Sequence, residues 1–291
     1  MDRIPVFYSP NMVASDNVGS SPSAGKPAEV VLSWAAAGFP TEQREPLPAT
    51  VEEFALAHEL AHVEDVLACR KANGFGNHLS SVARSLPSTT GSMLTAARHV
   101  LAASVPVAAS PTSGFHHAGW DSCEGFCTFN GLMVTVLALR KERPPLRVGI
   151  LDIDEHYGNG TEEIIQLHQV PGVPHWTFGA QDYSRGDGDR FLAELPNVVR
   201  GFAGCDLVLY QAGADPHTDD PYGRGVLSTA QLHERDRIVF AGLRDLGVPV
   251  VWNLAGGYQR PLRKVLDIHD NTMRACVEAY LETPLAEGCP G

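Results

Sequence analysis

Short apolar runs that alternate with helical patterns are the feature of this sequence that most restricts its fold. The runs are rich in β-branched residues and bounded by turn residues, which is typical of buried strands. They cover residues 6–8, 105–109, 147–153, 176–178, 206–211 and 249–254. Because strands that alternate with helices form βαβ units, the sequence predicts an α/β fold with a mainly parallel central sheet flanked by helices.

Helical patterns fill most of the segments between these runs. We expect helices at residues 51–70, 92–103, 126–140, 162–168, 229–246 and 270–281. Two stretches fit neither pattern: residues 14–28 are rich in Ser, Gly and Pro, and residues 73–90 resemble a long loop, which in a compact domain is often functional. No convincing linker divides the chain, so we predict one catalytic domain over residues 1–291.

Composition narrows the classes of partner. The chain has 44% hydrophobic residues, enough for a sizeable core, and a formal net charge of −12. Such a charge argues against binding to nucleic acid or to an anionic membrane, and it favours cationic substrates. We find no signal peptide, no run of ~20 apolar residues and no CxxC pair among the six cysteines. These features predict a cytoplasmic protein with reduced thiols.

Polar side chains follow four of the predicted strands. They are His116 and His117 in GFHHAG, Asp152, Asp154 and His156 in DIDEHYGNG, Asp215 in QAGAD, and Tyr258 in AGGY. The two adjacent histidines alone would also fit a solvated loop. Because ligands bind beyond the carboxyl ends of parallel strands, the convergence of these side chains predicts a site at that edge of the sheet.

The residue types at this edge indicate metal-assisted hydrolysis. Alternate residues of an extended segment share a side, so Asp154 and His156 point the same way, and Asp215 can supply a third ligand. Three N/O ligands with an open position are typical of a catalytic zinc-like site. Such a metal activates water and polarises a carbonyl, an imidazole can take the proton, and the hydroxyl of Tyr258 can stabilise an oxyanion.

These motifs carry a family resemblance. GFHHAG, EGFCTFNG, DIDEHYGNG, QAGAD and AGGY occur in this order over residues 114–258. Together they resemble the zinc-dependent histone deacetylase and acetylpolyamine amidohydrolase family, which has the arginase/deacetylase fold. The resemblance implies a hydrolase that removes an acetyl or other acyl group from a lysine-like or polyamine amine, with its active site at the carboxyl ends of the strands.

The resemblance also implies roles for single residues. Zn²⁺ would be bound by Asp154, His156 and Asp215. Catalytic roles would fall to His116, His117, Asp152, Asn159 and Tyr258. In these roles His117 is the general base and then the general acid, His116 gives electrostatic support, and Asp152 orients His116. Tyr258 polarises the substrate carbonyl, and Asn159 stands where many members carry an Asp partnered to the second histidine.

Further positions follow from the same resemblance. Gly125 and Phe126 would line a tunnel for the acyl-lysine stem, with Tyr183 in QDYSRGDGD as the opposite wall. A K⁺ ion would be bound near Asp152, with Thr177 and Phe178 completing its site.

Two alternatives remain open from the sequence. Dimanganese ureohydrolases use a D-x-H-x-D run, but here the last position is Gly158, which has no ligand, and His217 is a poor substitute for a missing carboxylate, so one metal is favoured. A catalytically silent binding protein of the same fold is disfavoured because all the expected ligands are present. The sequence does not choose between acylated lysine, acetylpolyamine and a related small amide, and it leaves a homo-oligomer open.

Overall fold

A parallel sheet forms the centre of the protein in a computed structural model that describes residues 1–19 and 21–282. Its seven strands are ordered β2-β1-β3-β7-β6-β4-β5, and every neighbouring pair is parallel. The strands are β1 (Ile4–Phe7), β2 (Thr41–Arg44), β3 (Val107–Ala109), β4 (Val148–Asp152), β5 (His175–Thr177), β6 (Leu207–Gln211) and β7 (Val250–Asn253). The predicted fold class is confirmed.

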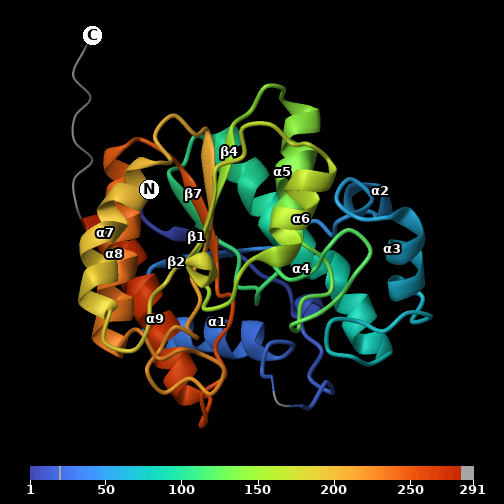
Figure 1. The fold of residues 1–291 in the computed structure, drawn as a ribbon, viewed down its shortest axis with the longest axis horizontal. Helices are drawn as coiled ribbons and strands as arrows, with labels where there is room; N and C mark the ends of the chain where they lie inside the picture. The colour runs from blue at the N-terminus through green and yellow to red at the C-terminus, as the bar shows by residue number, and fades with distance from the viewer. Residues whose placement is uncertain (20, 283–291) are drawn as a thin grey trace.

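Helices cover both faces of the sheet (Figure 1). One face packs against α1 (Lys26–Ala36), α7 (Gly188–Arg200), α8 (Thr229–Asp245) and α9 (Arg263–Val277). The other face packs against α2 (Val51–Phe54), α3 (Leu60–Leu67), α4 (Ser80–Ala103), α5 (Gly131–Glu142) and α6 (Asn159–Leu167). Short helical turns are η1 (Pro10–Met12), η2 (Phe178–Ala180) and η3 (Glu278–Glu282). Among the described residues, no helix is long and apolar enough to cross a bilayer.

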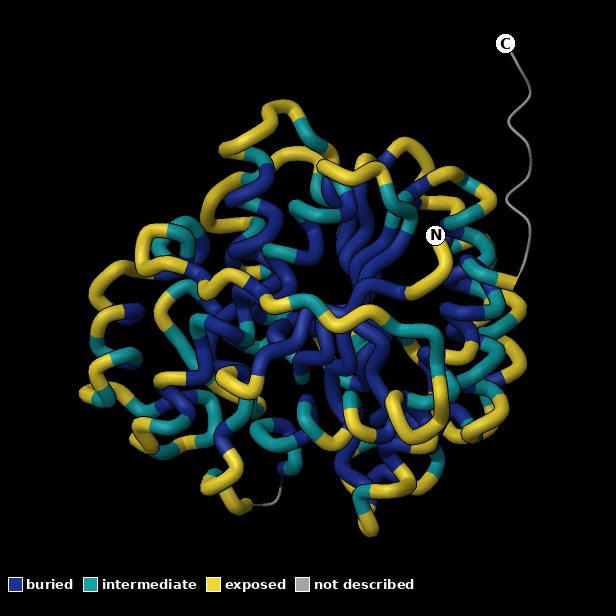
Figure 2. Tube along the Cα trace, turned by 180° about the vertical axis from the view of Figure 1, so that it is seen from behind, coloured by how far each residue is buried: buried dark blue, intermediate teal, exposed yellow. Residues whose placement is uncertain are grey.

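Two apolar cores lie on the two faces because successive strand residues point in opposite directions. In β4, Ile150 enters the core with α5, whereas Leu151 enters the core with α8. In β7, Trp252 packs against Trp34 of α1 with their ring centroids 5.5 Å apart, and Val251 faces the other way. Figure 2 shows the strands as a continuous buried centre beneath a more exposed shell. Burial on both faces explains the continuous apolar runs of the sequence.

Several predicted elements were wrong at their boundaries. Residues 80–90, expected to be a loop, form the first half of α4 despite Pro87. The helix expected at 51–70 is interrupted, so that α2 and α3 are separate. The helix expected from residue 126 begins at Gly131, because Asn130 caps it by accepting a hydrogen bond from the Met133 amide (3.0 Å).

Two small residues let α4 pack closely against the sheet and against the loop that follows β2. Ser92 donates a hydrogen bond to the carbonyl of Phe7 (2.6 Å) and lies 2.7 Å from the hydroxyl of Ser110. A Cβ atom added to Gly91 would lie 2.1 Å from the carbonyl oxygen of Leu47. Since that neighbour is backbone, it cannot move away cheaply, and any side chain at position 91 would push the helix off the segment it packs against.

We predict that Gly91→Ala destabilises the protein. Overpacking against backbone costs about 1–3 kcal/mol, which would lower the Tm by about 2–10 °C. The matched control is Gly25→Ala, because a Cβ there meets only the Pro22 oxygen, at 3.9 Å. Thermal unfolding of both variants measures the effect, and equal Tm values for the two would contradict the close-packing argument.

Candidate active site

The carboxyl ends of β4 and β6 bring three potential metal ligands together. Asp154 and His156 follow β4, and Asp215 follows β6, the neighbouring strand. One ligand atom from each of these side chains lies within 4.8 Å of the others. Within residues 1–19 and 21–282, no other group of three His, Cys, Asp or Glu side chains meets this criterion. The structure therefore brings together the three side chains that the sequence predicts as metal ligands.

Backbone amides hold the two carboxylates of this cluster. Asp154 accepts hydrogen bonds from the amides of Gly256 (2.8 Å) and His156 (3.0 Å). Asp215 uses Oδ1 to accept from the amide of Glu155 (3.1 Å), while its Oδ2 is buried without a hydrogen-bond partner. A buried carboxylate oxygen without a donor is destabilising unless a cation meets it, so its position fits a metal ligand.

The imidazole of His156 is oriented so that one ring nitrogen faces the two carboxylates. Its Nε2–H donates to the carbonyl of Tyr222 (3.2 Å), which leaves Nδ1 facing the carboxylates of Asp154 (3.1 Å) and Asp215 (3.3 Å). A backbone partner on the outer nitrogen is the usual way of fixing the tautomer of a metal-binding histidine. The residues present therefore fit a dication with N/O ligands, of which zinc is one.

His116 is a buried cation beside this cluster. Its Nδ1–H donates to Oδ2 of Asp152 (2.6 Å), and Oδ1 of Asp152 accepts from the side-chain amide Nε2 of Gln211 (2.8 Å). Burial alone would lower the pKa of His116, but the carboxylates of Asp152, Asp154 and Asp215 outweigh burial and raise this pKa to about 9. His116 is therefore charged near neutral pH.

His117 has the opposite electrostatic environment, although its ring centroid is only 4.2 Å from that of His116. Its Nδ1–H donates to Oδ1 of Asn159 (2.6 Å), and Nδ2 of Asn159 donates to the carboxylate of Glu124 (2.5 Å). Because a carboxylate only accepts, Glu124 fixes the orientation of the amide and leaves Nε2 of His117 as the basic nitrogen. Burial and the charge of His116 lower the pKa of His117, so this imidazole is neutral.

The segment that carries Tyr258 is held by a buried lysine that no sequence motif indicates. The ammonium of Lys26 donates to the carbonyls of Ala255 (2.6 Å) and Gly256 (3.4 Å), and Lys26 is fully buried. The amide of Tyr258 donates to Asp220 (2.8 Å). Burial, followed by the charges of Asp215 and Asp154, raises the pKa of the Tyr258 phenol well above its ordinary value, so its hydroxyl keeps its proton.

A cavity of about 580 Å³ opens beside His117 and His156. Gly125 and Tyr222 line it, and a Cβ at Gly125 would lie 2.3 Å from the ring of His117. The expected wall at Tyr183 was wrong. Tyr183 is buried in the core, where it stacks on Phe178 with centroids 5.3 Å apart and donates to Glu194 (2.7 Å). Tyr222, whose ring is 5.0 Å from that of Tyr258, supplies an aromatic wall instead.

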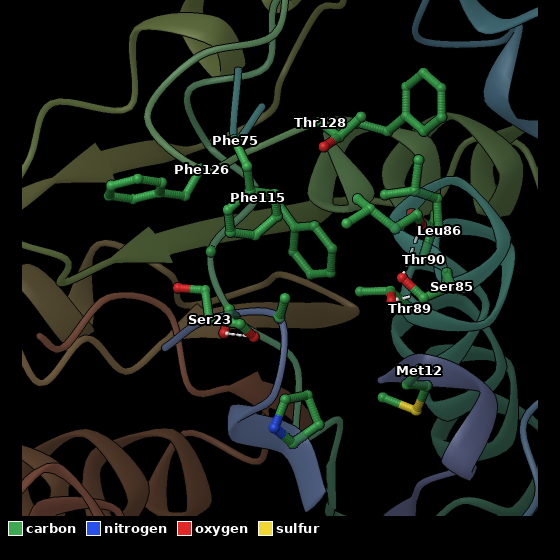
Figure 3. Close-up of a pocket in the computed structure, with 16 residues that line it drawn as sticks. Met12, Ser23, Phe75, Ser85, Leu86, Thr89, Thr90, Phe115, Phe126 and Thr128 are labelled. Carbon is green, nitrogen blue, oxygen red and sulfur yellow. Dashed lines mark hydrogen bonds between the residues drawn. The ribbon is translucent and has the colours of Figure 1, made fainter. Parts of the chain in front are cut away.

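A second, smaller cavity lies behind Phe126, between α4 and the segment that leads to the histidines (Figure 3). Its volume is about 50 Å³. The hydroxyls of Ser85 and Thr89 on its α4 side donate to carbonyls of their own helix, at 2.8 Å each. The ring of Phe126 separates this cavity from Tyr258, 5.6 Å away between centroids. The larger cavity is therefore the one wide enough for a substrate.

Other residues considered from the sequence have different surroundings. His217 uses both ring nitrogens, one with the hydroxyl of Thr229 (2.9 Å) and one with the amide of Asp219 (3.0 Å), so it is not part of the metal cluster. Thr177 lies opposite Asp152 in the sheet and accepts from the amide of Gly158 (3.2 Å). The carbonyl of Phe178 accepts from Arg224 (3.4 Å). The K⁺ site stays a prediction.

Comparison with known proteins identifies the family. The histone deacetylase domain model matches residues 26–173, and the chain belongs to this family. It is 26% identical to a probable deacetylase of Methanothermobacter thermautotrophicus over 87% of this chain and 85% of that protein. It is 28% identical to acetylpolyamine amidohydrolase 1 of Pseudomonas aeruginosa, over 49% of this chain and 48% of that protein. The crystal structure of the HDA15 HD domain superposes with a TM-score of 0.78 at 21% identity, covering 98% of this chain and 90% of that one, which shows the shared fold.

The paired histidines generate a titration prediction. An Asp at position 159 would place a carboxylate on Nδ1 of His117 and raise its pKa, but it would also meet Glu124. We therefore predict a higher pKa of His117 in the double variant Glu124→Gln/Asn159→Asp. This variant moves the carboxylate from position 124 to position 159 and the amide the other way, so the net charge is unchanged. NMR titration of the imidazoles in the zinc-loaded protein is the measurement, with Glu124→Gln as control. An unchanged pKa of His117 in the double variant would show that the residue at position 159 does not control the protonation of this imidazole.

Proposed function

We propose that this chain is a zinc-dependent amide hydrolase that removes an acetyl or other acyl group from a lysine-like or polyamine amine. Membership of the histone deacetylase family supports a deacetylase activity. The observation that carries the proposal further is the cluster of Asp154, His156 and Asp215 next to two histidines in different charge states. Relatives named acetylpolyamine amidohydrolase support the substrate class.

The three ligands would hold one dication, which when bound supplies an activated water and a Lewis acid for the amide carbonyl. His117 is neutral and directs Nε2 away from Asn159, so it is the group that accepts the proton of the attacking water and passes it to the leaving amine. His116 remains protonated against Asp152 and stabilises negative charge that develops beside it. The phenol of Tyr258, which keeps its proton, donates to the oxyanion.

Charge favours a cationic substrate at this site. The chain has a formal net charge of −12, which attracts amines over long range. The cavity at the site has room for a slender aliphatic stem between Gly125 and the aromatic ring of Tyr222. Phe126 contributes a further apolar surface near Tyr258. Acyl-lysines and acylated polyamines both have such a stem.

We predict one zinc ion per chain. Asp215→Asn removes one of two carboxylates of the cluster, and the loss of a ligand should weaken zinc binding by more than about 100-fold. Elemental analysis of protein purified without chelator tests both statements. The control is Asp219→Asn, an exposed carboxylate four residues further on, which should retain the metal. Two manganese ions per chain would contradict the proposal and favour a ureohydrolase-like enzyme.

We predict that Tyr258→Phe lowers kcat far more than it changes KM. A hydroxyl that stabilises an oxyanion acts in the transition state, and loss of one such donor costs on the order of 10²–10³ in kcat. The control is Tyr183→Phe, which removes a hydroxyl that donates to Glu194 outside the cavity at the site and should leave kcat close to that of the wild type. Steady-state kinetics on an acetylated lysine peptide measures both, and normal turnover by Tyr258→Phe would mean that its hydroxyl takes no part.

A further inference from the structure

The cavity at the site contains a carboxylate without a cationic partner. Its charged lining residues other than histidine are Glu124, Glu155 and Arg224. Arg224 forms an ion pair with Glu155 and also donates its backbone amide to that carboxylate (3.0 Å), so these two charges compensate each other. Glu124 is exposed, and among the interactions of the described residues its carboxylate accepts only from the neutral side-chain amide of Asn159. One negative charge is therefore available to a ligand.

A braced turn presents Glu124 at a fixed place. Gly125 and Phe126 both adopt positive φ, at 55° and 65°, and the amide of Cys127 donates back to the carbonyl of Glu124 (2.8 Å). The amide of Phe126 donates to the carbonyl of Gly74 (3.0 Å), which fastens the turn to a second loop. Positive φ is costly for Phe, and strained backbone of this kind is concentrated at functional sites.

Aromatic rings lie beside this turn. The ring of Phe126 is 6.4 Å from that of Tyr222, which is 47% exposed and lines the same cavity as Glu124. Both rings also pack against Tyr258. The faces of aromatic rings attract organic cations, and a carboxylate strengthens that attraction. A carboxylate next to aromatic rings in an open cavity is suited to an ammonium group.

The position of Glu124 also limits where that ammonium lies on the substrate. Two hydrogen bonds, of 2.5 Å and 2.6 Å, connect Glu124 through Asn159 to Nδ1 of His117. In the proposed reaction the leaving amine lies next to His117. An extended spacer of three or four carbons carries a second nitrogen about 5–6 Å from the leaving nitrogen, and Glu124 lines the same cavity as His117. An acyl-lysine inside a peptide has no ammonium at this distance from its ε-nitrogen. The nearest polar groups are the neutral backbone amides at the other end of its side chain.

We propose that Glu124 is a specificity-determining residue that binds a free ammonium of the substrate, so that N-acylated diamines and polyamines are preferred over acyl-lysine in a peptide. This inference rests on the proposed amide hydrolase function. It assigns to one carboxylate the choice between amine classes that the sequence leaves open.

The test compares two substrates that differ in one charged group. N-acetyl-1,4-diaminobutane carries an ammonium where N-pentylacetamide carries a methyl group. We expect the zinc-loaded wild type to prefer the cationic substrate in kcat/KM, and Glu124→Gln to reduce this preference about three- to tenfold, mainly through KM. Glu64→Gln on α3 is the matched control, because it removes the same charge from an exposed position outside the cavity. It should leave the preference unchanged.

A binding measurement supports the kinetics. With N-pentylacetamide as substrate, 1,4-diaminobutane should inhibit the wild type more strongly than pentylamine, and Glu124→Gln should abolish the difference. Tyr222→Leu should weaken inhibition by the diamine, whereas Tyr222→Phe should preserve it, because the ring face is retained. Added salt should reduce the preference of the wild type more than that of Glu124→Gln.

The outcomes separate the two proposals. Hydrolysis of both amides without a preference that depends on Glu124 overturns the specificity role alone. An equal loss of kcat on both substrates in Glu124→Gln also overturns it and means that Glu124 acts by positioning Asn159. If the zinc-loaded wild type cleaves neither of the two amides nor an acetylated lysine peptide, the hydrolase function is overturned and the specificity role with it.

Discussion

The burial of three carboxylates at one edge of the sheet is the constraint on which the site depends. Asp152, Asp154 and Asp215 are each at most 2% exposed. Ionised carboxylates in an apolar interior are strongly destabilising unless charges or hydrogen bonds compensate them. Asp152 is compensated by the imidazolium of His116, and the other two accept backbone amides. The Oδ2 atom of Asp215 accepts no hydrogen bond and remains uncompensated, and a bound dication would compensate its charge.

Lys26 connects this charge compensation to the shape of the Tyr258 segment. Burial lowers the pKa of Lys26 to about 8 against the opposing effect of nearby aspartates, so the ammonium remains mostly charged near neutral pH. It donates to the carbonyl of Ala255, a non-glycine residue with a φ of 51°, and a Cβ at Gly256 would lie 1.9 Å from the carboxylate of Asp215. The same interaction therefore places a positive charge near the carboxylates and stabilises a strained turn.

The sequence predicted the parts of the fold and the site that depend on local patterns. Buried parallel strands are apolar throughout, so six of the seven strands were recognisable, whereas β2 has the polar sequence TEQR and gives no such signal. Asp154, His156 and Asp215 were recognisable because each lies within four residues of the end of a strand. Lys26 was not, because it lies within a stretch rich in Ser, Gly and Pro, and its burial depends on tertiary contacts with residues more than 200 positions away. The cavity wall likewise depends on the tertiary fold of a loop, which no sequence periodicity predicts. Tyr222, and not Tyr183, lines the cavity for this reason.

The segment after β6 connects the cavity wall to two of the three proposed metal ligands. It contains Asp215, and its Tyr222 accepts the Nε2–H of His156 through the backbone carbonyl while presenting its ring to the cavity. Asp220 of the same segment holds the amide of Tyr258. Because the carbonyl orients the ligand and the side chain lines the cavity, the residue type at position 222 can change without changing what orients His156. Substrate preference can therefore vary at position 222 while the geometry around His156 is preserved, and in the proposed specificity the carboxylate of Glu124, which lines the same cavity, acts together with the ring at that position.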